Sequence, residues 1–576
     1  MALTHQAGPA LAADKLEVGY GLVLDGCQAT GHCESGAVQL FGAHITGPLI
    51  LRGAKLTNRA GVALHGDGLQ VDGDLVFGGG FRATGHGVNG AVRLFGAHIA
   101  GQMSMQGAKL TNEAGPALVG DDLQVDGGLF LDKGFEATGH GDLGAVRLFG
   151  AHITGQMSMQ GAKLTNEAGP ALHGEDLRVS AGLICDKRLR AAGHGELGAV
   201  RLFGAHITGQ LSLRGAKLTN EAGPALHADG LQVDGGLLCD EGFLATGRGV
   251  NGAVRLLGAH ITGQLSLAGA ELINEAGPPL VGDRIQVNGD LLLDEGFRAT
   301  GYGVGGAVRL LEALITGQLS LRGAELTNEA GLILDLEHAD IKQIFLPSVV
   351  VCPQGATGKS TCGTTARRVN LSGLVYTSLE DRQWSQWLHL IARHTYGYQP
   401  QPYQQLASVR RATGHDADAR KILIAQQQDL RERGEIGGFL IKIVHCLWGV
   451  LGGYGYRTGR IALALLIAVL AAGGMGFAAG NIPTSPGRYV AMHTAQTDPK
   501  DLNASPGPCS LTEQIGVGID RGLPLSTTGI RSRCDFDTIS RRGQAVTWAS
   551  WVLQFLVWAL VTLFVAGYVG LIRKVT

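Results

Sequence analysis

The chain has 576 residues, a formal net charge of −2, 91 glycines and few aromatic residues (6%). Its charge is unevenly divided, because the stretch up to Phe345 holds 24 Lys and Arg against 36 Asp and Glu, a net charge of −12. Since phosphate binding needs a basic footprint, this balance argues against nucleic acid as a ligand of the acidic stretch.

One phrase, GAVRLFGAHITG, recurs with small variations at a constant spacing of 54 residues. Its copies begin at Gly36, Gly90, Gly144, Gly198, Gly252 and Gly306. So regular a period is typical of a repeat solenoid, in which each unit contacts only its neighbours. A solenoid offers a long uniform surface, which favours binding over catalysis.

Within each copy the apolar residues alternate and are interrupted by glycines, which indicates very short strands joined at tight corners. In the copy from Gly198 the residues expected to face inward are Val200, Leu202, Ala205, Ile207, Leu211, Leu213, Ala216 and Leu218. The second half of each copy repeats the first at an offset of about 26 residues, so each copy predicts two coils with strands stacked about 4.8 Å apart. The fold class is therefore mainly β, a parallel β-helix over residues 1–350, whose pattern fades near Glu312 as expected of a capped end.

The remainder of the chain has a helical pattern. We expect residues 351–381 to close the solenoid as a linker and residues 382–435 to form a helical hairpin adaptor. The apolar stretch 436–456 is expected to lie in the membrane interface; Lys442 and His445 within it argue against the alternative of a third span.

Two long uncharged segments, 461–480 and 545–572, meet the length requirement of transmembrane α-helices, with residues 481–544 as an external loop between them. The start of the chain lacks the pattern of a signal peptide. The sequence therefore predicts a multi-pass protein of the plasma membrane with its N- and C-termini in the cytoplasm. Arg457 and Lys574 beside the spans agree with this orientation, whereas Arg541 on the outer side opposes it.

The cysteines fit the same topology. Cys509 and Cys534 are the two cysteines of the external loop, and a pair in an oxidising compartment is a candidate disulfide. Cys352 and Cys362 flank a polar stretch that lacks a second cysteine pair or paired histidines, so we expect no zinc site there. No metal and no cofactor is expected elsewhere.

A ladder of histidines recurs in every second coil: His44, His98, His152, His206 and His260. Side chains two coils apart are separated by about 10 Å, whereas zinc ligands lie about 2 Å from the ion, so these histidines do not share a metal. The ladder is instead a candidate recognition stripe. The Asn-Glu corners, such as Asn220-Glu221, are expected to be solvated loops.

Two motifs resemble nucleotide-binding loops. GxGxxG occurs at Gly85, Gly139, Gly193, Gly247 and Gly301. Dinucleotide binding needs such a loop to open a helix, but here each leads into the strand AVRL, so a turn with positive φ is expected. GATGKSTCG, from Gly355, departs from the phosphate-binding motif because Pro353 stands where its first glycine belongs.

The stretches LSGLVYTSLED, YQPQPYQQLASVRRATGHDADARKILIAQQ, GYGYRTGRIALALL and WVLQFLVWALVTLFVAGYVGLIRK resemble a family of actinobacterial membrane-anchored repeat proteins. The resemblance covers nearly the whole chain. It implies a pentapeptide-like β-solenoid joined to a helical segment and two C-terminal spans, and some members are labelled membrane-associated oxidoreductases. The resemblance carries no catalytic residues to this chain.

The function predicted from these features is a membrane-anchored cytoplasmic scaffold, whose solenoid is a docking surface for a cytoplasmic protein. One alternative is a membrane-associated oxidoreductase, which requires a cofactor site that the motifs do not supply. Another is a sensor or channel-like component gated through the external loop. The oligomeric state is left open.

Overall fold

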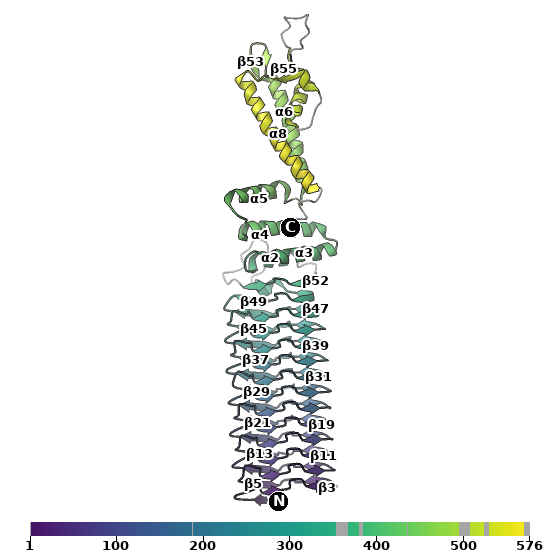
Figure 1. Ribbon diagram of the computed structural model, residues 1–576, viewed down its shortest axis with the longest axis vertical. Helices are drawn as coiled ribbons and strands as arrows, with labels where there is room; N and C mark the ends of the chain where they lie inside the picture. The colour runs from purple at the N-terminus through teal and green to yellow at the C-terminus, as the bar shows by residue number, and fades with distance from the viewer. Residues whose placement is uncertain are drawn as a thin grey trace. The chain divides into compact units, whose positions relative to one another are not determined.

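The computed structural model describes residues 2–186, 188–352, 367–379, 384–434, 436–454, 456–494, 507–523 and 529–568. The chain folds into two compact units, Met1–His415 and Asp416–Thr576. The first unit contains the repeats and is a parallel β-solenoid, as the periodicity predicts (Figure 1). The second is mainly helical.

Each coil of the solenoid contributes four short strands. In the coil that follows Gly198 they are β30 (Val200–Arg201), β31 (His206–Ile207), β32 (Leu211–Ser212) and β33 (Lys217–Asn220). The next coil repeats them as β34 (Leu226–His227), β35 (Gln232–Val233), β36 (Leu237–Leu238) and β37 (Leu244–Gly247). Each strand pairs in parallel with its counterpart, for example Val200 with Leu226, so two coils per repeat are confirmed.

The stacked strands build three parallel sheets. A 13-stranded sheet runs from β1 (Ala2–Thr4) to β48 (Glu325–Asn328), and a 14-stranded sheet runs from β2 (Leu11–Ala12) to β51 (Arg368–Asn370). The third has 25 strands because it takes two strands from each coil, and it ends at β52 (Val375–Leu379). All three sheets continue through the stack, so side chains at equivalent positions line up along it.

The core is the column of side chains inside the coils. Every residue predicted to face inward in the repeat from Gly198 is buried, from Val200 to Leu218. The largest fully buried side chains of this column include a set of phenylalanines: Phe77, Phe81, Phe135, Phe243 and Phe297. Burying an aliphatic or aromatic side chain of this size contributes roughly 1.5–3 kcal/mol, so the continuous core is the main source of stability.

A column of buried asparagines runs beside the apolar core, which makes the expectation for the Asn-Glu corners wrong for Asn220. Asn220 is 2% exposed, and its Nδ2 donates to the carbonyl oxygens of Gly195 (3.0 Å) and Pro224 (2.8 Å). Its equivalents Asn112, Asn166 and Asn274 make the same bonds in their repeats. Glu221 is exposed as expected. The asparagine is inside because its Nδ2 satisfies the Gly195 carbonyl group of the preceding coil and ties the end of β33 to Pro224.

Glycine is required at the corners for two different reasons. Gly204 has a φ of +64°, a left-handed conformation that disfavours side chains. At Gly209 the backbone of the preceding coil approaches so closely that a Cβ would overlap the carbonyl oxygen of Ala181.

The solenoid extends beyond residue 350. After β47 (Leu314–Ser320), β49 (Leu332–Asp335), β50 (Asp340–Phe345) and the short helix α1 (Ser348–Val351), strand β51 pairs with β49 and β52 pairs with β50. The described part of the segment 351–381, expected to be a linker or the end of the solenoid, therefore adds a further coil. The residues between α1 and β51 that carry the phosphate-loop-like stretch lie outside the described residues.

Two helices cover the last coil. The rings of Trp387 in α2 (Trp384–His394) and Tyr376 in β52 lie 5.3 Å apart. In α3 (Pro400–Ala412), Gln401 and Gln405 donate side-chain hydrogen bonds to the backbone carbonyls of Leu374 and Tyr376. The helices thus satisfy the open edge of the last coil and bury its apolar end. The expected hairpin 382–435 is divided, because α2 and α3 belong to the solenoid unit and α4 (Asp416–Arg433) begins the second unit.

The second unit continues with α5 (Phe439–Gly452), α6 (Thr458–Asn481), α7 (Leu511–Gly522) and α8 (Arg541–Tyr568). Short elements lie between α6 and α8: β53 (Pro483–Ser485), β54 (Arg488–Tyr489), β55 (Ala491–His493), the 3-10 helix η1 (Ile530–Ser532) and β56 (Cys534–Phe536). Helices α6 and α8 are long and apolar enough to span a membrane. Ile461 and Ala468 of α6 pack in one cluster with Val557 and Leu560 of α8.

The segment expected to be an external loop is partly a helix packed against the first candidate span. Glycines allow α6 and α7 to meet at their backbones, since a Cβ at Gly476 would lie 2.7 Å from the backbone N of Gly518. Close approach over small residues is the usual way in which membrane helices associate. Only the remaining described parts of 481–544 form the loop and short strands.

Candidate functional site

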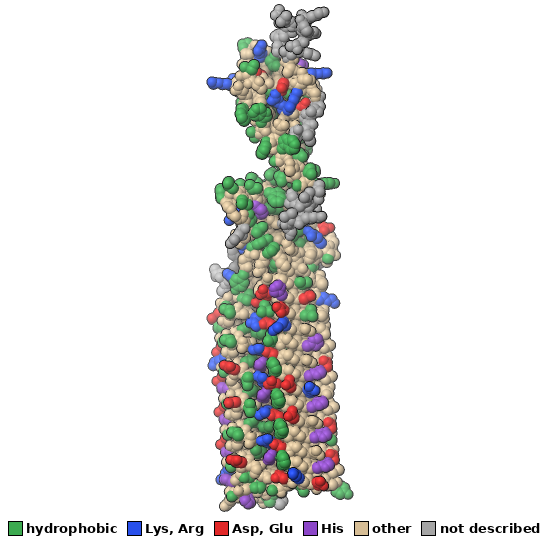
Figure 2. All heavy atoms as spheres, in the orientation of Figure 1, with side chains coloured by type: hydrophobic (Ala, Val, Ile, Leu, Met, Phe, Trp, Pro, Cys, Tyr) green, Lys and Arg blue, Asp and Glu red, His purple; other side chains and the backbone are tan. Residues whose placement is uncertain are grey.

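The histidine stripe, defined as His44, His98, His152, His206 and His260, lies on one face of the 25-stranded sheet. Each histidine stands opposite the intervening polar residue of the next coil, as His98 does opposite Gln70 and Gln124. His44, His98 and His206 expose 45%, 46% and 42% of their side chains, so the stripe is accessible. Figure 2 shows histidine side chains recurring along the solenoid surface.

Carboxylates that follow the adjacent strand of the next coil orient three of these rings. The Nε2 atoms of His44, His98 and His206 lie 3.0, 2.9 and 3.2 Å from the carboxylates of Asp72, Asp126 and Asp234, respectively. His260 instead contacts Gln286, with 3.1 Å between Nδ1 and Oε1. The histidine stripe is therefore a row of fixed, half-exposed polar groups.

A second stripe of exposed aromatic side chains follows the neighbouring corner. Phe41, Phe95, Phe149 and Phe203 occupy one position of four successive repeats and are 39–44% exposed, and we call them the phenylalanine stripe. Each lies three residues before a member of the histidine stripe. The sequence contained a signal for it, because Phe203 follows the inward Leu202 and so breaks the period-two alternation.

Buried carboxylates hold two of the turns that present these phenylalanines: Asp67 at Phe95 and Asp121 at Phe149. Asp67 accepts hydrogen bonds from the backbone N of Phe95 (3.2 Å) and from Arg93 (3.0 Å), while His65 lies 3.2 Å away. Burial opposes ionisation of Asp67, but the hydrogen bond from His65 and the charge of Arg93 lower its pKa. In return, the hydrogen bond to Asp67 raises the pKa of His65 despite its burial. Phe95 is thus displayed on a charged, hydrogen-bonded support.

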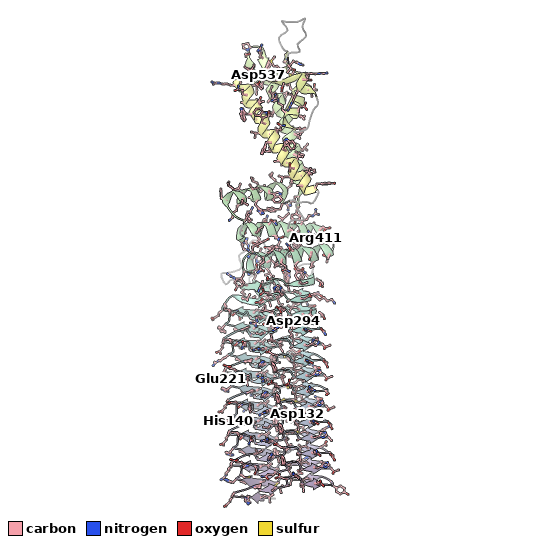
Figure 3. The ribbon with its side chains drawn as sticks, in the orientation of Figure 1. Asp132, His140, Glu221, Asp294, Arg411 and Asp537 are labelled. Carbon is pink, nitrogen blue, oxygen red and sulfur yellow. A yellow bond between two sulfur atoms is a disulfide. The ribbon has the colours of Figure 1, made fainter. Side chains whose placement is uncertain are left out.

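The opposite corner carries a third row of ion pairs. His86, His140 and His194 pair with Glu113, Glu167 and Glu221 at 3.1–3.5 Å. Arg248 replaces the histidine in the next repeat and pairs with Glu275 at 2.8 Å. His140 and Glu221 point outward from one edge of the solenoid in Figure 3. Exposed aliphatic side chains lie close by in the sequence, such as Val88 two residues after His86 and Val250 two residues after Arg248.

The GxGxxG segments are turns between strands. The segment at Gly85 connects β13 (Arg82–Gly85) directly to β14 (Val92–Arg93), and Gly90 within it has a φ of +108°. The segments at the other four positions lead into strands in the same way. They lack the helix N-terminus on which dinucleotide binding depends.

In the second unit, Cys509 and Cys534 form a disulfide with an S–S distance of 2.00 Å. Their side chains belong to a small core with Val490, Val517 and Phe536. The bond ties the start of α7 to β56. It is a structural feature of the segment between the two candidate spans.

A cluster of one cysteine and two histidines lies at the end of the solenoid. Cys352, His389 and His394 place one ligand atom each within 4.8 Å of one another, which no sequence pattern indicated. Cys352 is disulfide-bonded in the structure, and Cys362 lies outside the described residues. Burial lowers the pKa of both histidines, which keeps the rings neutral at pH 7. Both histidines lie outside the stretch between Cys352 and Cys362, so the sequence around the two cysteines did not indicate them.

Comparison with known proteins adds no assignment, because no family model, no curated protein and no solved structure matches this chain. The candidate site consequently rests on the geometry of the two adjacent stripes.

Proposed function

We propose that this chain is a membrane-anchored scaffold and that the solenoid binds a cytoplasmic protein along the phenylalanine and histidine stripes. The observation that carries the proposal is their register: an exposed aromatic ring and an exposed imidazole recur together in four successive repeats. Large aromatic side chains are enriched among residues that dominate protein–protein affinity. Contacts repeated along a rod add up even where each one is weak.

The chemistry of the surface defines the partner. Equivalent rungs are about 10 Å apart along the stack, so the partner presents apolar side chains at that spacing to the phenylalanines. The solenoid sequence is acidic overall, so basic groups on the partner complement it and steer its approach. An extended or repetitive protein segment fits both requirements better than a compact domain.

The apolar helices supply the anchor. In this proposal α6 and α8 cross the plasma membrane, and the solenoid and both ends of the chain are cytoplasmic. Helix α5 lies at the membrane surface, because Phe439, Leu440 and Val444 expose 77%, 76% and 65% of their surface while Lys442 prevents deep insertion. Two spans would hold the solenoid at the membrane and restrict its partners to that location.

The test compares partner labelling by two variants of the full chain fused to a proximity-labelling enzyme. The first replaces Phe95, Phe149 and Phe203 with serine. The control makes the same change to serine at Val88, Val250 and Val304. These residues are 73%, 72% and 90% exposed in loops at another corner. We expect the first variant to lose specific labelled proteins that the wild type and the control retain. Retention of every labelled protein by the first variant, with an unchanged circular dichroism spectrum, would contradict the proposal.

A further inference from the structure

The end of the solenoid brings a cysteine and two histidines into a geometry suited to a metal ion. Cys352 follows α1, and His389 and His394 lie on α2, so the packing of α2 against the last coils joins them. Cys352 is fully buried, His394 is 4% exposed, and His389 is half-buried. All three belong to the solenoid unit.

The two distances from sulfur to nitrogen match a tetrahedral zinc ion. Zn–S and Zn–N bonds of about 2.3 and 2.0 Å at tetrahedral angles place sulfur and nitrogen about 3.5 Å apart. The Sγ of Cys352 lies 3.2 Å from the Nε2 of His394 and 3.7 Å from the Nε2 of His389. These two distances lie on either side of the ideal value, so binding needs only small side-chain adjustments.

The orientation of His394 is already that of a metal ligand. Its Nδ1 lies 2.7 Å from the carbonyl oxygen of Arg367, and a carbonyl only accepts, so Nδ1 carries the proton. In the neutral ring this leaves the lone pair on Nε2, the atom that faces Cys352. A histidine that donates its other ring N–H to a backbone carbonyl is the usual outer-shell arrangement around zinc.

We infer that Cys352, His389 and His394 form a Zn²⁺ site once the disulfide of Cys352 is reduced. A disulfide sulfur is a poor ligand, whereas a thiolate is a strong one. Two equivalents of a low-molecular-weight thiol reduce the bond, giving two protein thiols and one small disulfide. Zn²⁺ then displaces the proton of the Cys352 thiol, which is released to solvent. These three ligands leave one position of a tetrahedral ion for a further donor.

The proposed topology gives a reason to expect the reduced form. The Cys509–Cys534 disulfide lies between the two candidate spans, whereas Cys352 precedes both of them. If α6 crosses the membrane, the two cysteine sites face different compartments, and disulfides persist in only one of them. Zinc would then cross-link α2, through His389 and His394, to Cys352 after α1. The metal site itself does not depend on the docking function.

The test is Co²⁺ titration of the metal-free full chain in detergent, with and without prior reduction. Cobalt reports a tetrahedral site through strong ligand-field absorption and a thiolate through a near-ultraviolet charge-transfer band. We expect one equivalent to bind to the reduced protein, both bands to disappear on adding Zn²⁺, and neither band to form with the oxidised protein. Cys352→Ala and His394→Gln should abolish the bands.

Matched controls separate this site from other ligands. His338→Gln changes an exposed histidine of the same unit, and replacing Cys509 and Cys534 together with serine removes the other reducible bond. Both controls should keep the bands. Because changes at a buried residue can unfold the end of the solenoid, the comparison of reduced and oxidised wild type decides the matter without any variant. Absence of the bands in the reduced wild type, or their persistence in Cys352→Ala, would overturn the inference.

Discussion

The solenoid and the helical unit are each stabilised by a different kind of internal contact. In the solenoid one local solution is repeated, so that Asn112, Asn166 and Asn220 make the same bonds and each coil contacts mainly the coils beside it. In the helical unit each contact occurs once, such as the backbone approach of Gly476 to Gly518 and the Cys509–Cys534 disulfide. Damage should therefore stay local in the first unit and spread through the second.

The largest effect is expected from Gly209→Val, because its side chain would overlap the Ala181 carbonyl group. Forcing two coils apart should lower the free energy of unfolding by about 3 kcal/mol. Hydrogen exchange measured by mass spectrometry should show lost protection around residues 181 and 209 and retained protection in distant coils.

The control for this change is Gly258→Asn. Gly258 has a φ of +62° with no atom within 4 Å of a Cβ, and asparagine tolerates this conformation. Gly258→Asn should lower the free energy of unfolding by less than about 1 kcal/mol. Uniform loss of protection along the solenoid in Gly209→Val would show that the coils are not independent.

In the helical unit, Gly518→Val tests whether the close contact between α6 and α7 stabilises the entire unit. The side chain would push α7 away from α6, and overpacking of this kind costs about 1–3 kcal/mol. Thermal unfolding in detergent should shift for the helical unit while the solenoid keeps its β-type circular dichroism. Gly474→Ala, where a Cβ meets no atom within 4 Å, is the control. Equal melting of Gly518→Val and wild type would refute the close packing.

A smaller local effect is expected from Asn220→Ala. It removes the side-chain donor of the Gly195 and Pro224 carbonyl groups. Because Pro224 keeps the hydrogen bond from the backbone N of Ala199, the loss of stability should be about 1–2 kcal/mol. The adjacent change Glu221→Ala removes an exposed partner of His194 and should stay within about 0.5 kcal/mol. Hydrogen exchange of β33 measures both. Similar losses of β33 protection in Asn220→Ala and Glu221→Ala would contradict the conclusion that only the asparagine supports the fold.

The smallest effect concerns pH at the end of the solenoid. Burial raises the pKa of Asp335 in β49 from 3.8 to about 6. The folded state therefore binds this proton more tightly than the unfolded state, so the contribution of Asp335 to stability is complete below pH 4 and is lost as pH rises through about 6. Protection of β49 in wild type relative to Asp335→Asn should fall by about 1–2 kcal/mol between pH 5 and 7.5. A constant difference would refute the raised pKa.

The regular part of the fold could be predicted because local pattern and tertiary packing coincide in a solenoid. The inward direction of Leu211 and the left-handed φ of Gly204 follow from the repeat itself. The burial of Asn220 could not be predicted, since it depends on a carbonyl group 25 residues earlier in the sequence. In the sequence the polar residues Asn220 and Glu221 stand side by side. Only the stacking of the coils shows that the asparagine is buried and the glutamate is exposed.

Of the candidate sites, those within the repeats could be predicted from the sequence, and the one formed by packing at the end of the solenoid could not. The histidine stripe could be predicted from spacing, and Phe203 left a signal in the broken alternation. The grouping at Cys352 left none, because His389 and His394 are 37 and 42 residues away and reach it only when α2 packs on the solenoid. A spacing of five along a helix also departs from the usual patterns for ligands on one face.

The central claim is that two spans anchor a cytoplasmic solenoid, and epitope accessibility in intact cells tests it most directly. Tags are placed at residue 5, next to Gly507 and after residue 576, one at a time in the full chain. An impermeant antibody or protease should reach the Gly507 tag before lysis and the other two only after it. Labelling of the residue 5 tag on intact cells would contradict the account, because the solenoid and its two stripes would then face the outside.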